Sequence, residues 1–129
     1  VIEKGKADIV VSFEKMEAVR WSPYLKPEGI AVINDYEIAP LPVAIGKAEY
    51  PQNTIESMKA CFDTRVLPGA ELAEKAGNPR TMNVVLLGAL IRAFGLTEVD
   101  WDQVLRENIP EKMLEVNLKA LHLGMETAL

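Results

Sequence analysis

The chain of 129 residues is long enough for one domain of ordinary size and leaves no room for a second. Apolar residues make up 49% of it and charged residues 26%, a composition that excludes intrinsic disorder. The net charge of −5 offers no positive field to phosphates or anionic lipids, so we expect neither nucleic acid nor a membrane as a partner. No apolar stretch approaches the roughly 20 residues that span a bilayer, and no signal-type segment opens the chain. These features indicate a cytoplasmic protein.

The first part of the chain has the pattern of a strand–helix–strand unit. Residues 7–13 are β-branched and almost continuously apolar, which is typical of a parallel strand buried on both faces. Residues 14–25 carry apolar positions at helical spacing and end near Pro23, and residues 30–34 form a second apolar strand. A strand, a helix and a strand within about 30 residues predict a right-handed βαβ crossover and an α/β fold class.

The middle of the chain is expected to be mostly connection. Pro40, Pro42 and Gly46 leave room only for a short edge strand at residues 43–45. Asn53 can then cap a helix that runs to Phe62, and residues 64–67 supply a further strand.

The remainder is predicted to be helical, with local signals at most of the helix ends. Gly77 ends a short helix over residues 70–76, and Gly95 ends a nearly all-round apolar helix over residues 80–94, which we expect to be central and buried. Asn78 followed by proline is a helix start. Asp100 can cap a helix over residues 101–109, and Pro110 can open the last one, over residues 111–128.

Several acidic and amide side chains follow the first two strands, at the edge where open α/β sheets place their ligands. The candidates for cofactor contact are Glu14, Asn34 and Asp35, and Glu37 lies close by in the sequence. Helix capping and loop solvation explain acidic residues at such places more often than ligand contact does, so both interpretations stay open.

Two asparagines fall on or beside helix faces that are otherwise suited to burial. Asn83 shares a face with leucines and a phenylalanine, and Asn117 flanks a leucine stripe. We expect both to be buried and to join helices or loops, because a buried amide must find partners, and contact with a cofactor is the less favoured alternative. Together with Asn78 they form the predicted set of structural polar residues.

The single cysteine and the single histidine exclude several kinds of site. One of each cannot hold an iron–sulfur cluster or a typical zinc ion. Cys61 has no neighbouring histidine or lysine that would activate it, so we expect it to be buried and inert. His122 falls on a charged helix face and is expected to be a surface residue.

Three stretches read together resemble the gamma-type domain of 2-oxoacid:ferredoxin oxidoreductases, and the resemblance spans nearly the whole chain. They are residues 4–14, 23–29 and 78–90. Residues 42–51 and 112–120 are most similar to the beta subunit of the indolepyruvate-oxidising type.

The resemblance implies a reaction in which a 2-oxoacid is decarboxylated on thiamine diphosphate, coenzyme A takes the acyl group and ferredoxin takes the electrons. In this family other subunits or domains hold the thiamine diphosphate and the iron–sulfur clusters, so this chain is expected to bind no cofactor and to be inactive alone. The expected role is assembly with the thiamine- and iron–sulfur-bearing subunit, with a share in the coenzyme A approach, and contact with ferredoxin would be indirect. The alternative is a free-standing α/β module that binds a small molecule at the strand ends.

The resemblance also implies a three-layer α/β/α domain with a mainly parallel sheet. Gamma-type domains have a Gly-rich turn and further segments before the point that matches Val1, so we expect residues 1–129 to be the C-terminal part of one such domain, with N-terminal strands missing. A sheet edge left uncovered in this way predicts self-association of the isolated fragment.

Overall fold

The computed structural model describes residues 1–128, and its centre is a parallel sheet of three strands. The strands are β1 (Ala7–Ser12), β2 (Leu25–Asn34) and β3 (Asp63–Leu67), in the spatial order β1-β2-β3. β2 pairs with β1 on one side and with β3 on the other, and both pairings are parallel. The predicted α/β class is therefore confirmed.

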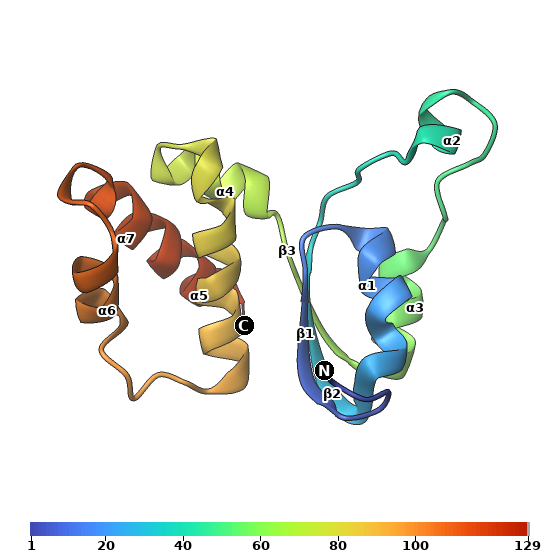
Figure 1. Cartoon of the computed structure of the whole chain (residues 1–129), viewed down its shortest axis with the longest axis horizontal. Coiled ribbons are helices and arrows are strands. Elements are labelled where there is room, and N and C mark those ends of the chain that lie inside the picture. Colours follow the sequence, from blue (N-terminus) through green and yellow to red (C-terminus); the bar gives the residue numbers. More distant parts are fainter. Residues whose placement is uncertain (129) are drawn as a thin grey trace.

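Helices cover both faces of the sheet, which gives the three layers expected (Figure 1). Both crossovers place their helices on one face, namely α1 (Lys15–Trp21) and α3 (Thr54–Cys61). The chain then passes to the other face, where Figure 1 shows the bundle formed by its last helices. These are α4 (Gly69–Ala76), the 3-10 turn Pro79–Thr81, α5 (Met82–Phe94), α6 (Trp101–Asn108) and α7 (Glu111–Thr127).

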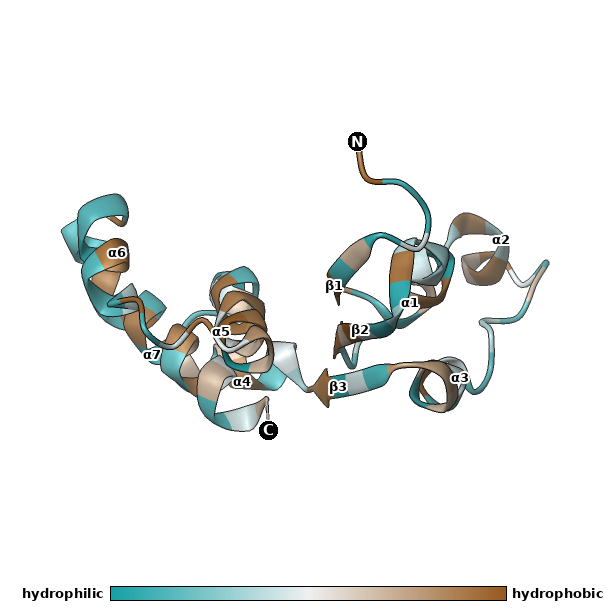
Figure 2. Ribbon diagram, turned by 90° about the horizontal axis from the view of Figure 1, so that it is seen from below, coloured by the Kyte–Doolittle hydropathy of each residue, from teal (hydrophilic) through white to brown (hydrophobic). Residues whose placement is uncertain are grey.

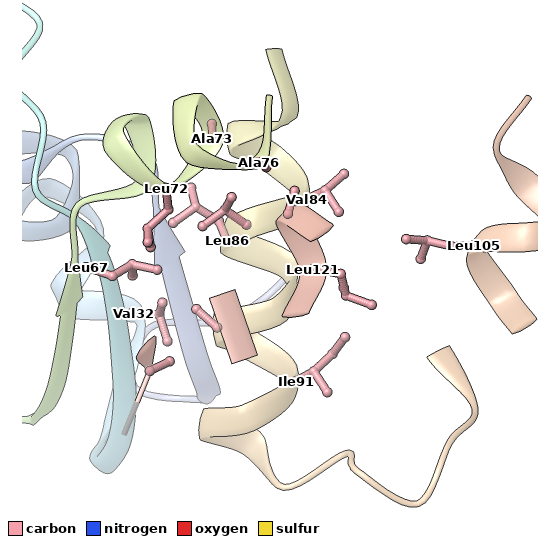
Figure 3. Close-up of a cluster of buried hydrophobic side chains, with 14 residues drawn as sticks. Val32, Leu67, Leu72, Ala73, Ala76, Val84, Leu86, Ile91, Leu105 and Leu121 are labelled. Atoms are coloured by element: carbon pink, nitrogen blue, oxygen red, sulfur yellow. The ribbon is translucent and has the colours of Figure 1, made fainter. Parts of the chain in front are cut away.

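The core is divided into two clusters by the central strand. Val32 points toward the helical bundle and packs in the cluster that contains Leu67, Leu86 and Leu121 (Figure 3). Its neighbours along β2 point to the opposite face, because successive side chains of a strand alternate. There Ala31 and Ile33 pack with Ala18 of α1 and Met58 of α3.

The predicted central helix is α5, which lies between the sheet and α7. α5 and α7 approach each other closely because a glycine of each helix lies against the backbone of the other. A Cβ on Gly88 would lie 2.1 Å from the carbonyl oxygen of Leu121, and one on Gly124 would lie 1.9 Å from that of Val85. Both distances are far below van der Waals contact, so the helices can cross this closely only at glycine.

Most of the local signals at helix ends operate as the sequence predicts. The exception is Asn53, which starts α3 in a left-handed conformation with a φ of 57° and makes no capping hydrogen bond with its side chain. Gly77 and Gly95 adopt left-handed conformations with φ of 116° and 72° and end α4 and α5. The Asp100 carboxylate accepts a hydrogen bond from the backbone N–H of Gln103 at 3.0 Å and caps α6. The Asn78 side chain likewise caps the 3-10 turn Pro79–Thr81, because it accepts a hydrogen bond from the backbone N–H of Arg80 at 2.9 Å.

The predicted strand at residues 43–45 is wrong, because this segment contains the short helix α2 (Leu41–Ala44). Pro42 has no N–H to offer a sheet, whereas the first turn of a helix does not need that donor. α2 belongs to a long connection over residues 35–53 that we call the arm, and Figure 1 shows it projecting away from the sheet.

The first crossover also differs from the prediction in its boundaries. α1 ends at Trp21, a 3-10 turn over Ser22–Tyr24 follows, and β2 begins at Leu25 rather than at Ile30. The register between Ala7 and Ile9 of β1 shifts against β2, which accommodates Pro27 and Gly29 in an irregular stretch. None of the helices in residues 1–128 is long and apolar enough to cross a membrane.

Candidate functional site

The carboxyl ends of β1 and β2 carry the polar residues that the sequence singles out. Glu14 follows β1 and is only 3% exposed, while Asp35 follows β2 and is exposed. The arm begins at Asp35 and returns at Asn53 to start α3. The structure therefore brings the predicted acidic residues to one edge of the sheet, as the topology of a parallel sheet requires.

The Glu14 carboxylate caps α1 and also holds the arm. One oxygen accepts the backbone N–H of Glu17 at 2.9 Å, which is the N-cap bond of the helix. The other oxygen accepts the hydroxyl of Tyr50 and, more weakly, the backbone N–H of Ile38 at 3.4 Å. The Tyr50 oxygen in turn accepts the N–H of Met16 at 3.0 Å. We call this network of Glu14, Tyr50 and Ile38 the root clamp, because it joins both ends of the arm to one helix start.

Lys15 adds an ion-pair cluster next to the root clamp. Its ammonium lies 2.7 Å from the Glu37 carboxylate and 3.5 Å from that of Asp35. The hydrogen bond to Glu37 raises the pKa of Lys15 above its ordinary value, against a smaller opposing effect of burial. The backbone N–H of Lys15 also donates to the carbonyl of Tyr36 at 3.0 Å.

A cleft of about 390 Å³ opens beside this cluster, between the arm and the start of α3. Its charged lining consists of one lysine and three acids, namely Lys15, Asp35, Glu37 and Glu56. Because the single ammonium is already held by carboxylates, the cleft is acidic toward anything that enters it.

The charges of the cleft disfavour a cofactor that carries phosphates. Thiamine diphosphate and coenzyme A need cationic or N–H donors for their phosphates. The start of α3 offers backbone N–H groups here, but the carboxylates outnumber the lysine. Over residues 1–128 no three histidine, cysteine, aspartate or glutamate side chains come together as a metal-binding group. The arrangement suits basic groups or a polar partner better than a phosphate.

Asn34, the third candidate for cofactor contact, is fully buried at the end of β2. Its Nδ2 donates to the carbonyl of Phe13 at 3.1 Å and to the sulfur of Met82 at 3.2 Å. Its Oδ1 accepts the N–H of Gly69 at 2.8 Å. Asn34 thus joins the loop after β1 to the starts of α4 and α5, and its amide faces protein on all sides.

The expectation for the two helical asparagines requires correction. Asn83 is exposed, so the prediction that it is buried is wrong. Phe94 at the other end of this face is exposed as well, whereas Leu87 and Leu90 between them are half-buried against the core. Asn117 is buried as predicted, but its Nδ2 donates to the carbonyl of Met113 at 2.8 Å within the same helix. It therefore does not tie two helices together through this bond.

Neither Cys61 nor His122 is expected to form a functional site. The burial expected for Cys61 is wrong, because the residue lies exposed at the end of α3. His122 is exposed as predicted, and its Nε2 lies 2.7 Å from the Asp102 carboxylate, which links α7 to α6.

Sequence reasoning missed Tyr50 and Lys15, which organise the site. Tyr50 lies 36 residues from its partner Glu14, so no local pattern connects the two. The only available signal was a lone aromatic residue at the end of a proline-rich connection.

A family model described as pyruvate ferredoxin/flavodoxin oxidoreductase matches residues 1–127. Among curated proteins, the chain is 38% identical to indolepyruvate oxidoreductase subunit IorB of Thermococcus kodakarensis and 33% identical to the protein of that name from Archaeoglobus fulgidus. These matches cover 99% and 100% of this chain but only 66% and 67% of the relatives. The chain thus spans about two thirds of the length of these proteins.

Solved structures with the same fold include the gamma subunit of a keto/oxoacid ferredoxin oxidoreductase from Geobacter sulfurreducens. It superposes with a TM-score of 0.69 at 19% identity, over 99% of this chain and 65% of that one. The 2-oxoglutarate:ferredoxin oxidoreductase of Magnetococcus marinus, solved with 2-oxoglutarate, coenzyme A and succinyl-CoA bound, gives 0.67 at 22% identity. That match covers 97% of this chain and 20% of the other.

Proposed function

This chain belongs to the pyruvate ferredoxin/flavodoxin oxidoreductase family, and from that membership we propose that it is part of a subunit of a 2-oxoacid:ferredoxin oxidoreductase of the indolepyruvate type. The observation that carries the proposal is the sequence match to IorB proteins over essentially the whole chain. The shared fold of the gamma subunit supports the family assignment and says nothing about the substrate.

We further propose that residues 1–129 form the C-terminal part of one gamma-type domain, whose role in the enzyme is assembly. The enzyme would oxidise a 2-oxoacid with decarboxylation and pass the electrons to ferredoxin, and bound thiamine diphosphate would supply the carbanion chemistry. The charge pattern of the cleft supports placing the thiamine diphosphate and the phosphates of coenzyme A on other parts of the enzyme. The single exposed cysteine likewise supports placing the iron–sulfur clusters on the partner subunit.

The alternative, a free-standing module that binds a small molecule at the strand ends, is not favoured. Glu14 and Asn34 are engaged by protein groups. Of the three candidates only Asp35 lines the open cleft, where it shares Lys15 with Glu37. Ligand contact through Asp35 stays a prediction.

Coexpression of the full-length protein with the thiamine-bearing subunit of the same organism tests the proposal. We expect one complex that reduces ferredoxin with indole-3-pyruvate and coenzyme A, and neither subunit should do so alone. A stable monomer that does not bind the other subunit and carries a tightly bound small molecule would instead support the alternative of a free-standing binding module. Assays in which pyruvate and 2-oxoglutarate compete with indole-3-pyruvate would identify the 2-oxoacid that the enzyme oxidises.

A further inference from the structure

The tip of the arm exposes an unusually long apolar segment. Residues 38–46 contain no charged side chain, and none of the nine is buried. Leu41 is 72% exposed, Ile38 58% and Ile45 55%. We call residues 38–46 the tip, and Figure 2 shows the hydrophobic colour of α2 within it. A contiguous apolar patch of this kind on a soluble domain marks an interaction site.

The tip covers nothing within residues 1–128. Neither hydrophobic cluster of the core includes any residue of the arm. In Figure 1 the arm carries α2 away from the sheet, well clear of the helical bundle. Connections in compact domains are mostly shorter than about 12–15 residues, and longer ones usually serve a function. The tip therefore does not stabilise this chain by packing on it.

The arm is nevertheless held in one orientation. The root clamp fixes one end at Ile38 and the other at Tyr50, and both attach to the start of α1. Within the tip, the carbonyl of Pro40 accepts the N–H of Ala44 at 2.9 Å, and two prolines restrict the backbone. A surface that is ordered before binding loses less entropy on association, so the clamp favours docking.

Acidic groups surround the base of the arm and indicate the charge of the partner. Asp35, Glu37 and Glu56 line the cleft against a single lysine. A contact between two copies of this chain through the same surface would bring these carboxylates toward one another. A partner with basic side chains around an apolar groove would complement both features.

We propose that the tip inserts into an apolar groove with a basic rim on the thiamine-bearing subunit of the enzyme. This inference rests on the proposed function and names the surface through which that assembly forms. The tip supplies the apolar anchors, led by Leu41, and the acidic cleft meets the basic rim. The exposed apolar residues on other elements, such as Val99 between α5 and α6, take no part.

The test measures binding of full-length variants to the thiamine-bearing subunit by titration calorimetry. Leu41→Ser and Ile45→Ser should each weaken binding at least tenfold, whereas Val99→Ser, an equally simple loss of exposed apolar surface, should bind as the wild type does. Thermal unfolding of the free Leu41 and Ile45 variants should match the wild type, because the tip is not part of the core. Glu56→Lys should weaken binding, and Glu74→Lys on the exposed face of α4 serves as its charge-matched control.

The possible outcomes separate the two proposals. If the wild type binds and both tip variants bind equally well, the tip is not the docking surface, although the assembly proposal stands. If the wild type does not bind the other subunit at all, the proposed function fails and this inference with it. If the free protein is a dimer that Leu41→Ser converts to a monomer, the tip binds a second copy and the inference is overturned.

Discussion

Gly124 of α7 lies so close to Val85 of α5 that its Cα hydrogen occupies the space beside a backbone carbonyl. The reciprocal contact places Gly88 of α5 against the carbonyl of Leu121. Both partners are backbone atoms of regular helices, so neither can rotate away as a side chain would.

Gly124→Ala should therefore lower the free energy of unfolding by about 3 kcal/mol or more, and Gly88→Ala by a similar amount, because the helices must separate to admit a methyl group. Gly5→Ala is the matched control: Gly5 has a φ of 73° but open space around it, so the cost there is only backbone strain of about 1–2 kcal/mol. Urea denaturation measures all three. Equal midpoints for Gly124→Ala and Gly5→Ala would show that the helices do not cross closely.

Asn34 is the buried amide whose removal should matter most. Asn34→Leu leaves the N–H of Gly69 and the carbonyl of Phe13 without their partner, at about 1–3 kcal/mol for each group. Asn83→Leu, on the exposed face of α5, should change stability by no more than about 0.5 kcal/mol. Chemical denaturation compares the two. A loss at Asn83 as large as the loss at Asn34 would contradict the structure.

The root clamp predicts coupling between Glu14 and Tyr50. Tyr50→Phe removes the hydroxyl that donates to Glu14 and accepts from Met16, and it should cost about 1–2 kcal/mol. The double variant Glu14→Gln/Tyr50→Phe should lose less than the sum of the single losses, with a coupling energy of about 0.5–3 kcal/mol. Proteolysis within the arm should also be faster in Tyr50→Phe than in the wild type. Strict additivity would show that the two residues act independently.

Lys15 predicts a stability difference that depends on pH. Its pKa in the folded protein is raised, so the ion pair with Glu37 stabilises the fold fully below the unfolded pKa of about 10.4 and loses its effect as the pH rises through the folded pKa. Lys15→Met should be less stable than the wild type by about 0.2–1 kcal/mol at pH 7. Urea midpoints of the two proteins should converge as the pH rises through the folded pKa of Lys15. A gap that widens as the pH rises would show that the charged Lys15 ammonium does not stabilise the fold.

Local sequence signals predicted the sheet and the ends of most helices correctly, because each depends on neighbouring residues. Gly77, Gly95 and Asp100 act within one turn of their own positions. The strand expected at residues 43–45 failed because a strand needs a partner at the sheet edge, which the sequence cannot place. Local sequence patterns could not predict the root clamp either, because it joins residues that are far apart in the chain.

Asn83 shows a different limit. α5 is apolar around nearly its whole circumference, so a helical projection groups Asn83 with Phe94 without showing that these two residues are exposed. The positions of the sheet and of α7, the latter set by Gly88 and Gly124, determine which sides of α5 are inside.

Because its side chains alternate, the strand β2 contributes residues to both core clusters. Val32 belongs to one cluster, and its neighbours Ala31 and Ile33 belong to the other. Loss of β2 would open both faces of the sheet at once, which makes the strand the centre of a single cooperative unit. Amide hydrogens at residues 31–34 should then exchange with solvent only when the whole domain unfolds, while those at the tip of the arm exchange without it.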